Sequence, residues 1–177
     1  MTDWLMVSRW VVIVVTTTVA QIGLAPQFPV FGVVVDLMLA MSIAAGIAAG
    51  PERGAIVGFF LGLLYDAMRP GPLGVSALAY SLVAFAVGTL LVSVITVRRT
   101  LAAAVMFLAS GVGVLGYAVV AELFGQHTLT NGRLWQITVV VALSAALLSP
   151  LLVPIARWAE GEGAIEGRSG VLGRIDA

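Results

Sequence analysis

Long stretches of apolar residues, separated only by short polar breaks, run through almost the whole of this 177-residue chain. Only 10% of the residues are charged, 60% are hydrophobic, and the mean hydropathy is +1.09. Soluble domains carry about 25% charged residues, so a globular protein of this size could not cover its surface with the charges present. We therefore expect an integral membrane protein with nearly the whole chain in the bilayer.

The apolar stretches predict helices. They are continuous and lack the alternating pattern of a membrane strand, and helices satisfy every backbone polar group within one segment. A span needs about 20 apolar residues, and the polar breaks leave six candidates. They fall at about 5–25, 31–49, 54–68, 73–95, 101–124 and 134–158. This predicts an all-α six-transmembrane-helix bundle over residues 1–159, followed by a Gly-rich, charged tail, 160–177, that should be disordered.

The arginines predict the orientation of the spans. With six spans both termini lie on one side, and that side holds seven arginines against two on the other. The seven are Arg9, Arg53, Arg98, Arg99, Arg157, Arg168 and Arg174, and the two are Arg69 and Arg133. Because basic residues favour the cytoplasmic side, we expect both termini in the cytoplasm. The segment "TVAQ" (18–21) is a weak cleavage site, so we expect the first helix to be retained.

Polar residues gather on the predicted outer side. Asp36 lies a few residues into the second span, Asp66 ends the third, Glu122 ends the fifth, and Arg69 follows in a loop. A charge inside a span is costly, so Asp36 is a candidate for function, with bonding to a neighbouring helix or loop as the alternative. Asp66 and Arg69 could instead pair across one helical turn, and Glu122 could be an interfacial residue. We expect Asp36 and Asp66 to lie close together, bonded to each other's surroundings or to Arg69.

Three glycines follow one face of the third span. Gly54, Gly58 and Gly62 are spaced four apart, which lets another helix approach closely. That helix could belong to the same bundle or to another protein. The loop "RPGPLG" (69–74) should be rigid, because proline fixes φ and glycine permits a sharp reversal.

The residues that several classes of function require are absent from this sequence. There is no cysteine and one histidine, so we expect no disulfide and no metal site. No phosphate-binding or hydrolase motif occurs, and no basic patch points to nucleic acid. We expect no cofactor and no enzymatic activity. An intramembrane enzyme that uses Asp36 and Asp66 on a lipid-linked substrate is the least supported hypothesis.

The residues between 36 and 88 carry a more specific pattern. Its strings are "DL" (36–37), "GPERGAIVGFFLGLLYD" (50–66), "PLG" (72–74) and "AL" (77–78), with Gly88 beyond them. This order resembles the MreD family of rod shape-determining membrane proteins. The "GPERGA" turn is similar to that of high-GC Gram-positive members. The motif turns contain Glu52, Arg53, Pro72, Leu73 and Gly74. The chain departs from the family at Val35, where proline is frequent, and at Ala84 and Phe85, where Gly-Tyr is frequent.

The resemblance implies a fold similar to the substrate-binding (S) subunits of energy-coupling-factor transporters. It implies a multi-pass protein of the bacterial cell membrane that contacts membrane lipid and acts as a non-catalytic scaffold in the cell-elongation complex. Its expected partners are MreC directly, and RodA, a class B penicillin-binding transpeptidase and MreB filaments directly or indirectly. In this role Asp66 would cap the glycine-lined helix and anchor the "RPGPLG" loop. The alternative is the substrate-binding subunit of an energy-coupling-type small-molecule importer, since such subunits hold their ligand at an outward-facing polar site.

Overall fold

The computed structural model describes residues 2–69, 72–91, 98–123, 125 and 132–161. Six α-helices follow one another along the chain, and a short 3-10 helix, η1 (Ala25–Gln27), follows the first. They are α1 (Thr2–Gly23), α2 (Leu37–Ala49), α3 (Pro51–Ala67), α4 (Val75–Leu91), α5 (Arg99–Leu123) and α6 (Leu134–Glu160). Among the described residues the only β pairing is an isolated bridge between Val30 and Val33. The predicted all-α bundle of six helices is confirmed.

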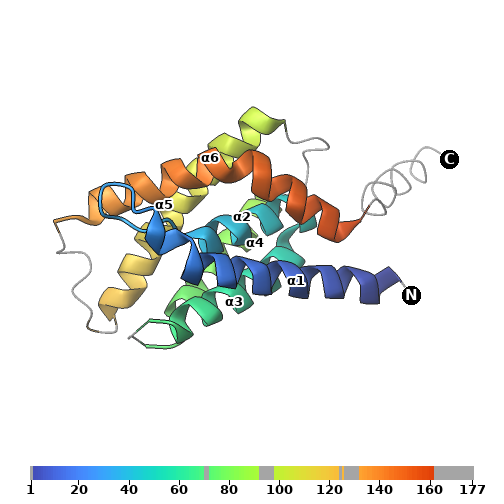
Figure 1. The fold of residues 1–177 in the computed structure, drawn as a ribbon, viewed down its shortest axis with the longest axis horizontal. Coiled ribbons are helices and arrows are strands. Elements are labelled where there is room, and N and C mark those ends of the chain that lie inside the picture. The colour runs from blue at the N-terminus through green and yellow to red at the C-terminus, as the bar shows by residue number, and fades with distance from the viewer. Residues whose placement is uncertain (1, 70–71, 92–97, 124, 126–131, 162–177) are drawn as a thin grey trace.

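Helix α2 is the centre of the bundle. It packs against all five other α-helices, and it lies in the middle of the arrangement in Figure 1. Each residue from Met38 to Ile47 is buried. Because α2 meets protein on every side, it is apolar all round rather than amphipathic.

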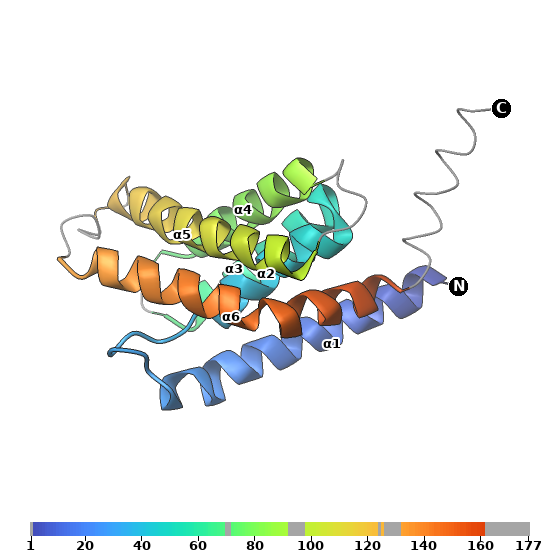
Figure 2. The same ribbon diagram turned by 90° about the horizontal axis from the view of Figure 1, so that it is seen from above.

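The remaining helices form two hairpins and one peripheral helix around α2. The α3–α4 pair and the α5–α6 pair make the largest helix contacts in the bundle. Helix α1 contacts α2, α3 and α6 less extensively, and it runs beside α6 along one edge of the molecule (Figure 2).

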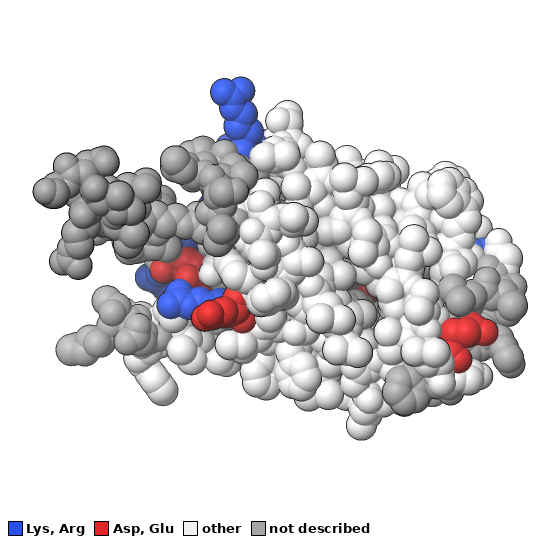
Figure 3. Space-filling model, turned by 180° about the vertical axis from the view of Figure 1, so that it is seen from behind, with Lys and Arg blue, Asp and Glu red and all other residues white. Residues whose placement is uncertain are grey.

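The outer surface fits a bilayer. Helices α1, α5 and α6 are long and apolar enough to cross a membrane. On the face shown in Figure 3, charged side chains gather toward the two ends of the molecule, and the broad band between them is almost free of charge. Trp158 at one end of α6 and Trp135 at the other are exposed, as expected of aromatic residues at the two membrane interfaces.

Helix α2 begins later than the sequence predicts. The second span was expected from residue 31, but α2 starts at Leu37, and most of the apolar residues just before it form an irregular loop. Phe31 and Gly32 have positive φ angles of 51° and 76°, which end any regular helix there. At the other end of the chain, α6 runs on to Glu160. Residues 92–95 of the fourth span, residue 124 of the fifth and residues 162–177 of the tail lie outside the described part.

The three glycines of α3 face the backbones of neighbouring helices. A methyl group added at Gly58 would lie 2.8 Å from the Tyr80 carbonyl oxygen, and one at Gly62 would lie 2.5 Å from the Ala77 Cα atom, both on α4. At Gly54 it would lie 2.6 Å from a backbone atom of α2. The stripe therefore lies at contacts inside the bundle, where only glycine lets the helix backbones meet.

We expect Gly62→Ala to lower the free energy of unfolding by roughly 1–3 kcal/mol, because the added methyl group forces α3 and α4 apart. Gly116→Ala is the matched control on α5, because an added methyl group there has no atom within 4 Å. It should raise the stability by up to about 1 kcal/mol through helix propensity. Unfolding of the purified protein in mixed micelles with increasing SDS, followed by circular dichroism, measures both effects. Equal losses in the two variants would contradict the close-packing interpretation.

Candidate functional site

Asp66 holds the start of α4 from the last turn of α3. Its side chain accepts the backbone N–H groups of Gly74 at 2.8 Å, Ser76 at 3.0 Å and Ala77 at 3.4 Å. The first N–H groups of a helix have no partner within the helix, and a carboxylate also interacts favourably with this end of the helix dipole. Asp66, which is only 7% exposed, is thus a helix cap supplied by the neighbouring helix.

Asp36 performs the same task for α2. It is the N-cap residue, and its Oδ1 atom accepts the N–H of Leu39 at 2.9 Å. Its Oδ2 atom accepts the Tyr80 hydroxyl from α4. Asp36 therefore stands at the beginning of a helix rather than inside one, which corrects the expected position. Aspartate is among the best N-cap residues, so the helix starts where this side chain can bond its own first turn.

Two tyrosines connect the surroundings of the two aspartates. The ring of Tyr80 lies 5.7 Å from that of Tyr65, centroid to centroid, and Tyr65 immediately precedes Asp66. Arg69 Nη1 donates to the Tyr65 hydroxyl at 2.7 Å, and its guanidinium lies over the same ring. We call these five residues the aspartate cluster and this end of the bundle the aspartate end. Among the described contacts, no hydrogen bond joins the two carboxylates, and Arg69 donates to Tyr65 rather than pairing with Asp66.

The aspartate cluster is suited to structure rather than to acid-base chemistry. Asp36 and Asp66 are 8% and 7% exposed, and each carboxylate bonds donors that define a helix start. In the part of the chain that the structure describes, no group of three metal-ligating side chains occurs. The arrangement can therefore fix the relative positions of α2, α3 and α4.

The turn that joins α2 to α3 lies at the opposite end of these helices. Gly50, with φ of 84°, ends α2 and precedes α3, and Pro51 occupies the first turn of α3, where its missing N–H is not needed. Glu52 is exposed in that first turn. A methyl group added at Gly88 of α4 would lie 2.5 Å from the Pro51 nitrogen. The turn therefore requires glycine at two positions, Gly50 in the turn itself and Gly88 on the helix that packs against it.

Glu160 joins three helices at this second end, which we call the Glu160 end. Its side chain, 3% exposed, pairs with Arg53 at the start of α3 at 2.6 Å. It also accepts the Trp10 Nε1–H of α1 at 2.8 Å. Arg9 of α1 donates to the carbonyl of Trp158 at 3.1 Å. The end of α6 is thus connected to both α1 and α3.

Sequence reasoning missed Glu160 and Gln21. Glu160 was placed in the tail, although the buried positions Leu152, Ala156 and Ala159 continue a helical spacing up to it. Gln21 of α1 accepts the Leu37 N–H at 2.7 Å and donates to the Val35 carbonyl at 3.0 Å, a second cap on α2. A polar side chain near the end of an apolar span was the available signal.

The remaining candidate residues lie at or near helix ends. Glu122 occupies the last turn of α5, and its carbonyl accepts the Gly125 N–H at 3.0 Å. Pro72 and Leu73 precede the start of α4, and Leu73 is exposed. Residues 70–71 and His127 lie outside the described residues.

We expect Asp66→Asn to lower the free energy of unfolding by roughly 1–3 kcal/mol, because the amide group offers a donor where backbone donors need an acceptor. Amide hydrogen exchange over residues 74–77 should become faster. The control Glu52→Gln, at an exposed carboxylate, should change the stability by no more than about 0.5 kcal/mol. Unchanged stability and exchange in Asp66→Asn would show that the cap is dispensable.

Comparison with known proteins adds a family match. The sequence profile of the family described as rod shape-determining protein MreD matches residues 1–157. No curated protein and no solved structure matches the chain. The expected likeness to transporter S subunits therefore stays a prediction.

Proposed function

The chain belongs to the MreD family of rod shape-determining membrane proteins, and we propose that it is a non-catalytic scaffold of the cell-elongation complex. In this proposal it binds MreC directly. It connects, directly or indirectly, with RodA, a class B penicillin-binding transpeptidase and MreB filaments, and so supports lateral peptidoglycan synthesis and cell shape. The observation that carries the proposal is the family match, which extends through all of α1–α5 and most of α6.

The geometry of the aspartates supports a non-catalytic role. Asp36 and Asp66 were the only acid pair that the sequence offered to an enzyme of lipid-linked substrates. Both are occupied by hydrogen bonds at helix starts. A general acid or base must instead reach a proton on its substrate.

The distribution of arginines supports the orientation that we propose, with both termini in the cytoplasm. Arg9, Arg53 and Arg157 belong to the Glu160 end, where α1 begins and α6 ends. Basic residues favour the cytoplasmic side. In this orientation the aspartate end faces outward.

The glycine stripe does not provide a free surface for MreC. Gly54, Gly58 and Gly62 lie against α2 and α4. We therefore propose that MreC binds a different surface, one that is exposed on the outside of the bundle. The hollow on the outside of α6 is apolar, so it offers no polar ligand site that would support the importer alternative.

We expect the tagged, detergent-solubilised chain to co-purify with MreC from the same organism, and to restore rod shape in cells depleted of their own MreD. Gly116→Ala should fold and purify as wild type, since its side chain would meet no neighbour within the chain. An unrelated six-helix membrane protein serves as the control for non-specific capture. A folded chain that neither binds MreC nor restores shape would refute the scaffold, and a small molecule that co-purifies with it would favour the importer.

A further inference from the structure

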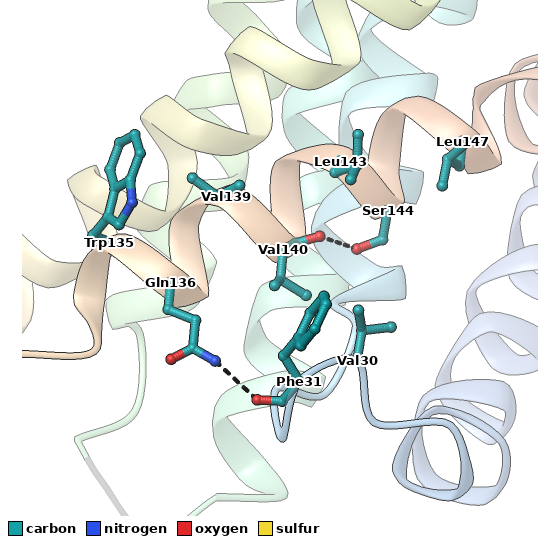
Figure 4. A pocket seen from close by; sticks show the side chains of 9 residues that line it. All are labelled: Val30, Phe31, Trp135, Gln136, Val139, Val140, Leu143, Ser144 and Leu147. Carbon is teal, nitrogen blue, oxygen red and sulfur yellow. Dashed lines mark hydrogen bonds between the residues drawn. The ribbon is translucent and has the colours of Figure 1, made fainter.

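A groove runs along the side of α6 that faces away from the bundle, with a volume of about 300 Å³. One wall is α6 itself, and the other is the loop that carries Val30 and Phe31 (Figure 4). We call it the α6 groove. Its lining includes Phe31, Trp135, Val140, Leu143, Ser144 and Leu147.

The loop wall of the α6 groove is held in place. Val30 and Val33 exchange two backbone hydrogen bonds of 2.9 Å, and Gln136 Nε2 of α6 donates to the Phe31 carbonyl at 2.9 Å (Figure 4). Phe31 keeps a φ of 51°, an uncommon conformation for a bulky residue, and the residue is 83% exposed beside the groove. The groove is therefore preformed.

The interior of the α6 groove is apolar. The Ser144 hydroxyl donates to the Val140 carbonyl within α6, so its polarity is satisfied inside the helix. The Gln136 amide bonds the loop at one end of the groove. Nothing in the middle of the groove requires a polar ligand.

The α6 groove is continuous with the surface that faces lipid. Helix α6 is long and apolar enough to span a membrane. The groove extends along it from Trp135 to Leu147, which is about 18 Å at 1.5 Å per residue. This is slightly more than half of a hydrocarbon core about 30 Å thick. Leu147, 72% exposed on the rim, is followed one turn later by the exposed Leu151, so the apolar surface of α6 continues beyond the end of the groove.

The shape of the α6 groove suits a linear apolar chain. The groove is about 18 Å long at 1.5 Å per residue, and its lining is almost entirely apolar. We propose that the α6 groove binds one acyl chain of a phospholipid from the leaflet at the aspartate end. This proposal does not depend on the scaffold function.

We expect native mass spectrometry of the detergent-purified chain to show one retained phospholipid, with re-binding of palmitoyl-oleoyl-phosphatidylglycerol after delipidation. Leu147→Trp and Leu143→Trp place an indole in the groove from exposed positions. An indole that displaces two methylene groups should reduce retention about tenfold. Leu151→Trp, exposed on the same helix but not in the groove lining, is the matched control and should retain the lipid. Circular dichroism shows whether each variant is folded. If one groove variant does not fold, the lipid retention of the other groove variant tests the proposal.

Three results would overturn the lipid proposal. Equal lipid retention in all variants would mean that the retained lipid surrounds the protein non-specifically. If the delipidated wild type binds no lipid after lipid is added back, the groove is not a lipid site. If the groove variants keep the lipid but lose co-purification with MreC, a partner helix occupies the groove. If the wild type and every variant fail to bind MreC while lipid retention is as expected, the result counts against the scaffold function. The lipid proposal then stands.

Discussion

The ends of the short inner helices set the main constraint on this structure. Helix α2 has 13 residues and α3 has 17, or about 20 and 25 Å at 1.5 Å per residue. A hydrocarbon core is about 30 Å thick, so these helices cannot carry both ends into water without help. Unpaired backbone groups in lipid are costly, so the protein must bond these ends itself. Asp36 and Gln21 do this for the start of α2, and Asp66 does it for the start of α4.

Close backbone contact is the second part of the same solution. Apolar burial gives no preference for protein over lipid tails, so membrane helices associate through tight packing and hydrogen bonds. Gly58 and Gly62 bring α3 onto α4, and Gly88 brings α4 onto the turn at Pro51. The capping carboxylates can reach the neighbouring helix because these glycines allow the helices to approach so closely.

The sequence was sufficient for the helix class and number, because uninterrupted apolar stretches admit few other structures in lipid. It was not sufficient for the start of α2. Val33, Val34 and Val35 are as apolar as any span, and only the backbone at Phe31 and Gly32 shows that the chain is irregular before Asp36. Composition cannot report a dihedral angle.

The candidate site was predictable in its residue types but not in its bonds. Asp36 and Asp66 stood out because carboxylates are rare in this chain. Their partners did not, since most are backbone N–H groups that every residue has. Glu160 was overlooked because charge near a chain end suggests a tail, whereas its partners Trp10 and Arg53 are distant in sequence. The pairing of α3 with α2 and α4 could not be read from glycine spacing, which serves contacts within and between chains equally.

The α3–α4 hairpin is pinned at both of its ends. Asp66 holds the start of α4 at one end, and the contact of Gly88 with the Gly50–Pro51 turn holds it at the other. With glycine contacts between these points, α3 and α4 cannot slide or pivot against each other without breaking several contacts at once. We therefore expect them to move together, and α2 is joined to them through Tyr80. Within the described part of the chain, we therefore expect a change of shape to arise where α1 or the α5–α6 pair meets this unit.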